Sequence, residues 1–84
     1  MVATPEWLAR RGGNLRAGNP GYSLFVDVAG APLYKLVIAP AGGSFVGHVT
    51  ETITGRLVGD QASGATKEAA ARAALEVLRK ELGW

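Results

Sequence analysis

Apolar and polar residues alternate along the middle of the chain with the period of two that half-buried β-strands have. The pattern runs through YSLFVDV (22–28) and LYKLVIA (33–39) and predicts a strand in each. Because so few residues join them, these two strands must be antiparallel. After the turn PAGG, the run SFVGHVTETIT (44–54) is rich in β-branched residues and predicts a third strand.

The continuation after residue 54 has two interpretations. Thr54 and Gly55 suit a tight hairpin turn, which makes RLV (56–58) a short fourth strand. Alternatively, the third strand runs straight on, with Gly55 in a bulge. The hairpin is the favoured interpretation. In either case GDQASG (59–64) is expected to form a loop.

A helical period replaces the alternation over residues 66–82. Thr66 is suited to cap the start of this helix, and Gly83 is suited to end it in the left-handed conformation. One side of the helix is apolar, and its small residues precede its large ones, so its first half can approach a sheet closely. The apolar stripe consists of Ala71, Ala74, Leu75, Leu78 and Leu82.

The run TPEWLARRGG predicts a second, short helix over residues 4–11. Thr4 is a suitable N-cap, Pro5 suits the first helical position, and Gly12 suits the residue that ends the helix. Residues 12–21 are rich in Gly, Asn and Pro and are expected to form a loop.

These elements predict an α+β fold in a single domain over residues 1–84. A three- to four-stranded antiparallel sheet over 22–58 carries the long C-terminal helix on one face, and the short N-terminal helix precedes it. A chain of 84 residues has room for one hydrophobic core only.

Charge and cysteine content narrow the possible roles. The net charge is +2, and residues 1–21 hold three arginines and one glutamate, so the whole excess lies there. The absence of cysteine excludes disulfides and thiolate metal sites and fits a cytoplasmic protein. No apolar run reaches the roughly 18 residues of a membrane span, so no membrane association is expected. Residues 1–11 lack the basic-then-apolar order of a signal peptide.

The sequence contains no evident set of catalytic residues. His48 is the single histidine, and no nucleophile or second metal ligand is placed to act with it. The carboxylates Asp27, Glu51 and Asp60 belong to different predicted elements, whereas acid–base catalysis needs convergent groups. We therefore expect no enzyme activity, no metal, no cofactor and no small-molecule substrate.

One face of the predicted sheet has no helix to cover it. A single long helix covers one side of three or four strands, so the other side meets either solvent or a partner. Lys35 is expected on that side, and the candidate interface residues there are Phe25, Val37, Val46, His48 and Thr50. The first hypothesis is accordingly a protein-interaction or self-associating module that binds a protein partner or forms a homodimer.

The run GATKEAAARAALEVL after a β-meander resembles the double-stranded RNA-binding domain. That family ends with a helix of the pattern S-K-K-x-A-K-x-x-A-A-x-x-A-L, along which Thr66, Lys67, Ala73, Ala74 and Leu75 align. The resemblance implies that lysines at the helix start bind phosphates across an RNA groove. The family has a cluster of lysines there, whereas this chain has Lys67 alone, with Glu68 beside it.

The alternative hypothesis is thus binding of double-stranded RNA or another nucleic acid. The basic arm RRGGNLR and the start of the last helix would then contact phosphates through Arg10, Arg11, Arg16, Lys67 and Arg72. A three-stranded sheet followed by such a helix is also similar to plant-type and integrase DNA-binding domains and to antitoxins of the HicB kind, in which it builds dimers. The frame TPEWLARRGG…LRKELGW also looks like that of small bacterial proteins without an assigned role.

Overall fold

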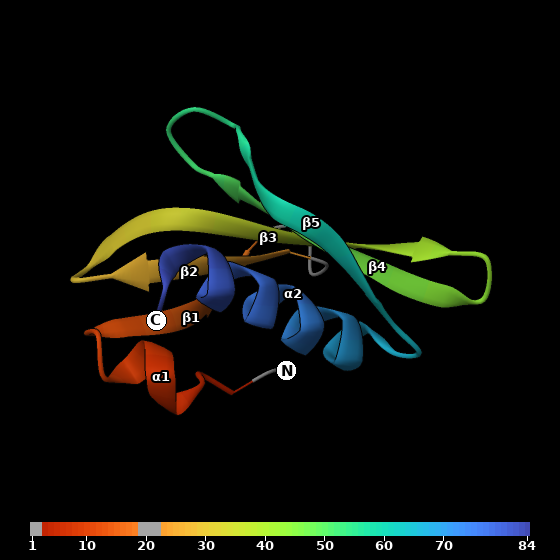
Figure 1. Ribbon diagram of the computed structural model, residues 1–84, viewed down its shortest axis with the longest axis horizontal. Coiled ribbons are helices and arrows are strands. Elements are labelled where there is room, and N and C mark those ends of the chain that lie inside the picture. The colour runs from red at the N-terminus through yellow and green to blue at the C-terminus, as the bar shows by residue number, and fades with distance from the viewer. Residues whose placement is uncertain (1–2, 19–22) are drawn as a thin grey trace.

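Five antiparallel strands form one sheet in chain order, with one helix before the strands and one after them (Figure 1). The computed structural model describes residues 3–18 and 23–84. Within these residues the elements are α1 (Glu6–Ala9), β1 (Gly13–Ala17), β2 (Ser23–Val28), β3 (Ala31–Ala41), β4 (Ser44–Glu51), β5 (Leu57–Gly64) and α2 (Lys67–Leu82). The fold is therefore α+β with an antiparallel sheet, as the sequence predicts.

The prediction of three or four strands is wrong, because a segment expected to be a loop forms a fifth strand. β1 lies within the predicted loop 12–21, with Leu15 opposite Val26 and Arg16 opposite Phe25. The short alternation of apolar and polar residues in this strand was not recognised, because its Gly and Asn residues are typical of loops. Tyr22, expected at the start of β2, lies outside the described residues.

The hairpin interpretation of the third strand is confirmed, but the fourth strand is longer than expected. β4 ends at Glu51, and its N–H donates to the carbonyl of Arg56 across a turn that contains the left-handed Gly55 (φ 73°). β5 then extends through 59–64, the second segment expected to be a loop. A register shift and the left-handed Gly59 (φ 69°) interrupt the alternation there.

The core lies between the sheet and α2, and small residues let the two approach closely. A side chain on Gly47 would lie 3.1 Å from the carbonyl oxygen of Ala70 and 3.2 Å from the Cβ of Ala74. Thr66 caps the helix by accepting from the N–H of Ala69, as predicted. The fully or nearly fully buried apolar residues are Leu8, Leu24, Val26, Leu36, Ile38, Val49, Ala70, Ala71, Ala74, Leu75 and Leu78.

The N-terminal segment differs from its prediction in the cap and in the length of its helix, which was expected over 4–11 and covers Glu6–Ala9. Thr4 does not cap α1; its hydroxyl accepts a 3.1 Å hydrogen bond from the N–H of Leu15 in β1. The helix also starts later, because Pro5 occupies the N-cap position. Leu8 is fully buried and packs directly on Gly13, where a side chain would collide with it.

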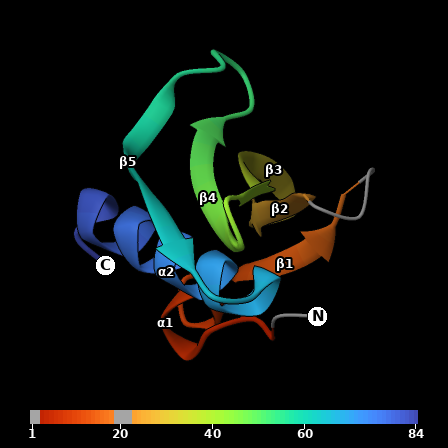
Figure 2. The ribbon, with the colours of Figure 1, turned by 90° about the vertical axis from the view of Figure 1, so that its right-hand side faces the viewer.

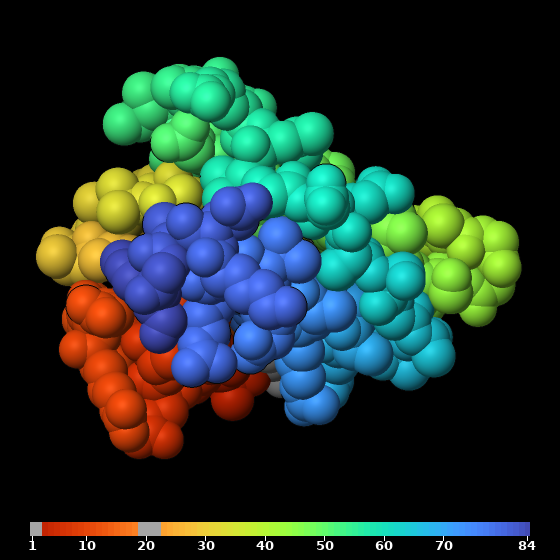
Figure 3. Space-filling view, in the orientation of Figure 1, coloured from red at the N-terminus to blue at the C-terminus, as the bar shows by residue number. Residues whose placement is uncertain are grey.

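Both helices lie on the same side of the sheet. Seen along the sheet, the strands curve over α2 and α1, so that the helices occupy the concave side (Figure 2). α2 contacts β3, β4 and β5, whereas α1 contacts β1. Figure 3 shows that the helices cover the middle of this side, while the β3–β4 and β4–β5 turns project beyond them. The convex face has no helix over it in the described parts of the chain.

Candidate interaction surface

The convex face of the sheet is built by the residues that alternate with the core positions. Cross-strand pairing aligns Phe25 with Lys35 and Lys35 with Thr50. On the ends of this row, Arg16 pairs with Phe25, and Leu57 pairs with Thr50. All five strands therefore contribute one side chain to a continuous row across the convex face.

A second row runs beside the first. Val37 pairs with Ser23 on one side and with His48 on the other, and Val46 lies opposite Ala39 farther along. The structure thus brings together on one face the five residues that alternation alone assigns to an uncovered surface. Phe25, Val37, Val46, His48 and Thr50 are all half-buried.

At one end of the first row, Arg16 contacts two neighbouring side chains. Its Nε donates to Asp27 Oδ2 at 2.9 Å, and its guanidinium lies 4.7 Å from the centre of the Phe25 ring. The side-chain hydrogen bond to Asp27 raises the pKa of Arg16. Lys35 approaches the same ring, with its Nζ 5.9 Å from the ring centre. Phe25 therefore makes cation–π contacts with two basic side chains, Arg16 and Lys35.

The other end of the face is apolar and exposed. Leu57 is 66% exposed and Leu33 is 37% exposed, although both are large aliphatic residues. Ile53, in the turn between β4 and β5, is 90% exposed. Sequence reasoning missed these three residues, although Leu33 has the same strand parity as Lys35 and Val37. Leu57 lies beside Thr50 in the first row, and Leu33 shares the outward parity of Lys35, so both add apolar area to the convex face.

Both edge strands of the sheet have features that oppose pairing with a strand of another chain. On β5, the left-handed Gly59 and the register shift interrupt the strand in its middle, and the exposed Asp60 follows. On β1, the outward N–H of Leu15 already donates to Thr4. Bulges, charges and covered edge groups oppose strand-to-strand pairing with another chain. The face, rather than an edge, is therefore the candidate interaction surface.

The predicted nucleic-acid contacts do not form one patch. Arg16 lies on the convex face, whereas Arg10 and Arg11 follow α1 and Lys67 and Arg72 belong to α2 on the concave side. Several of them are engaged within the protein. Arg10 pairs with Glu6 at 2.7 Å, Arg72 pairs with Glu68 at 3.9 Å, and Arg11 lies 5.4 Å from the centre of the Trp84 ring.

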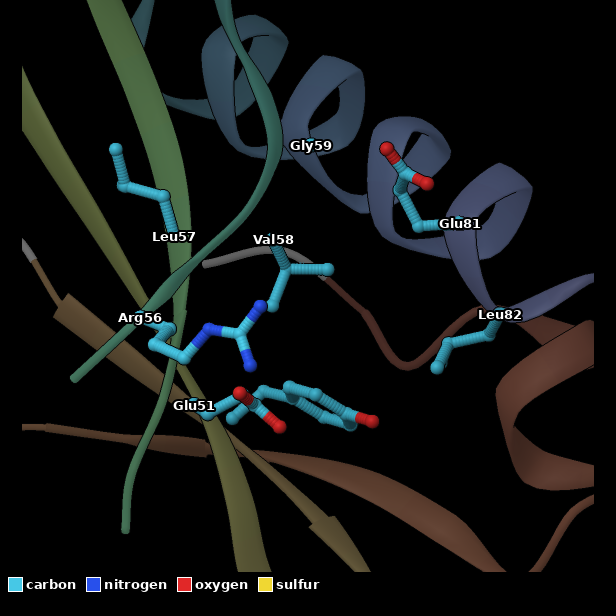
Figure 4. A pocket seen from close by; sticks show the side chains of 8 residues that line it. Glu51, Arg56, Leu57, Val58, Gly59, Glu81 and Leu82 are labelled. Atoms are coloured by element: carbon cyan, nitrogen blue, oxygen red, sulfur yellow. The ribbon is translucent and has the colours of Figure 1, made fainter. Parts of the chain in front are cut away.

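A cleft of about 330 Å³ opens between the β4–β5 hairpin and the end of α2 (Figure 4). Arg56 projects into it toward Glu51, and Leu82 enters from the helix. Its polar and charged lining side chains are Tyr34, Glu51, Arg56 and Glu81. The described residues that line it are Tyr34, Glu51, Arg56, Leu57, Val58, Gly59, Glu81 and Leu82.

A second hollow of about 350 Å³ lies between the N-terminal segment and α2. Trp7, Pro5 and Leu75 supply apolar walls, and Arg72 and Glu76 supply the polar ones. In neither hollow do three side chains of the kinds that bind metals come together, nor do they elsewhere in residues 3–18 and 23–84.

The described helices include none that is both long and apolar enough to cross a membrane. In the comparisons with known proteins, no family model, no curated protein and no solved structure matches this chain.

Proposed function

We propose that this chain is a non-catalytic protein-binding module and that the convex face of the sheet is its docking surface. One observation carries the proposal. The five candidate interface residues share a face over which no described helix lies, and exposed Leu33 and Leu57 extend that face. Ordinary solvated sheet faces are rich in charged residues, whereas this one is mostly apolar or neutral.

The charge of the face favours a protein over a nucleic acid. Among its outward residues, Arg16 is neutralised by Asp27, which leaves Lys35 as the remaining fixed positive charge near the centre. A nucleic-acid site needs several cations, because each phosphate contact adds only a modest increment of affinity. An apolar centre with few charges is instead typical of protein interfaces.

Site-specific photo-crosslinking tests the proposal. A photoreactive phenylalanine derivative replaces Thr50 on the convex face and, in a control variant, the exposed Lys80 on α2. In cells that express the chain, irradiation is expected to link the Thr50 variant, and not the Lys80 variant, to a protein. Equal crosslinking from both positions, or none from position 50, would contradict the proposal.

The alternative is binding of duplex RNA or another nucleic acid through the concave side. Its support is that four of the five predicted phosphate contacts belong to α1, its C-cap region or α2, all on the concave side of the sheet. A titration with duplex RNA at low salt tests it, with Lys67→Ala as the variant expected to bind more weakly. The absence of any change in backbone NMR shifts would end this alternative.

A further inference from the structure

The chemistry of the convex face specifies what its partner must present. Resting on the proposed function, we propose that the partner is a protein segment with one or more Asp or Glu side chains among apolar residues. The carboxylate of the partner pairs with Lys35, and its apolar side chains pack on Val37 and Leu57.

The first argument is the charge left without a counterpart on the face. Arg16 and Asp27 satisfy each other through two hydrogen bonds, at 2.9 and 3.4 Å. Lys35 lies beside the Phe25 ring, and within residues 3–18 and 23–84 it forms no ion pair. A partner carboxylate supplies the charge that this ammonium group lacks, at a side chain that is only half-buried and therefore accessible from the convex face.

The second argument is the position of Lys35 among apolar groups. Its cross-strand neighbours are Phe25 and Thr50, and Leu57 follows Thr50 in the same row. Val37 is the next outward residue on β3. A charge in the middle of an apolar surface gains strength from partial desolvation and fixes the register of a bound segment.

The third argument is the size of the face, which disfavours a second copy as the occupant. Five strands at a spacing of roughly 4.8 Å span roughly 24 Å, which with a usable strand length of roughly 22 Å gives an area of roughly 530 Å². Two such faces bury about 1,060 Å², which is less than the roughly 1,200 Å² of stable specific complexes and suits a weakly bound segment better than a permanent dimer. A second copy would also bring Lys35 against a face with the same net positive charge, whereas an acidic segment would not.

A displayed library of random peptides tests the inference with purified full-length chain as the bait. Three baits are used in parallel: the wild type, Lys35→Glu and, as a control on the concave side, Lys80→Glu. Circular dichroism confirms that the variants fold. Peptides selected on the wild type are expected to be enriched in Asp and Glu next to apolar residues and to shift NMR signals of β2, β3 and β4.

The expected effect of Lys35→Glu is a loss of affinity for these peptides of about tenfold or more, because the new carboxylate repels theirs. Lys35→Gln is expected to lose less, and Lys80→Glu is expected to change the affinity less than about twofold, since Lys80 lies on the opposite side of the sheet from the proposed docking face. Selection of peptides without acidic enrichment that still bind the convex face would overturn this inference and leave the proposed function intact.

Two other outcomes are distinguishable from these. If no peptide is enriched, or if the enriched peptides bind only the concave side, both the inference and the proposed function fail. If light scattering gives twice the monomer mass and Lys35→Glu restores the monomer mass, the occupant of the convex face is a second copy and the acidic partner is refuted.

Discussion

Replacing Gly64 by alanine tests the close contact between the sheet and α2. A Cβ at this position would lie 2.6 Å from the carbonyl carbon of Ala69 and closer still to the backbone nitrogen of Ala70. Real Cβ atoms essentially never approach other atoms so closely. Because the obstructing atoms belong to the helix backbone, no side-chain rotation relieves the collision, and α2 must move away from β5.

The expected change in the free energy of unfolding is the sum of two opposing effects. Overpacking a tightly packed contact costs about 1–3 kcal/mol, and a backbone obstacle places this substitution in the upper part of that range. Replacing glycine by alanine also restricts the unfolded chain, which offsets about 0.4–1 kcal/mol. The net loss in the free energy of unfolding is therefore about 2 kcal/mol. For a domain of this size that corresponds to a fall in melting temperature of roughly 8–16 °C.

Thermal and urea denaturation followed by circular dichroism measure the change. Gly43→Ala is the matched control, because that glycine has a left-handed backbone (φ 86°) but no atom within 4 Å of a new Cβ. It is expected to cost only about 1 kcal/mol, from backbone strain alone. Adding Ala69→Gly to Gly64→Ala should not restore stability, because the backbone atoms remain. An unchanged or raised melting temperature for Gly64→Ala would refute the close packing of α2 on β5.

Three further substitutions test separate parts of the fold. Leu78→Ala removes a fully buried side chain and is expected to cost about 2–5 kcal/mol in urea denaturation; a loss below about 1 kcal/mol would argue against its burial. Thr66→Ala removes the hydroxyl that accepts from Ala69 and is expected to cost about 1 kcal/mol and some helical signal, whereas full stability would contradict the cap. Trp84→Ala removes a ring 6.3 Å from that of Trp7 and is expected to change the near-ultraviolet circular dichroism, which an unchanged spectrum would disprove.

The candidate surface was predictable to the extent that it follows from alternation. Phe25 and Val37 are outward because their neighbours in sequence are core residues, and antiparallel pairing keeps such residues on one face. Leu57 was missed because it follows the turn at Gly55, and only the register places it beside Thr50. The separation of the arginines was not predictable either. Arg16 and Arg10 lie on opposite sides of the sheet, and the sequence of the first strand, which carries Arg16, looks like a loop.

Local pattern by itself determined α2 with both its caps, the positions of β2, β3 and the first part of β4, and the side of each element that faces the core. These features depend on residues a few positions apart, whose spacing encodes the period of the helix or strand. Only the tertiary structure decided that 13–17 and 59–64 are strands. Both are Gly-containing edge segments that pair with the strand next to them in the chain and contact a helix, α1 for β1 and α2 for β5. Such contacts between elements leave no period in the sequence of the segment itself.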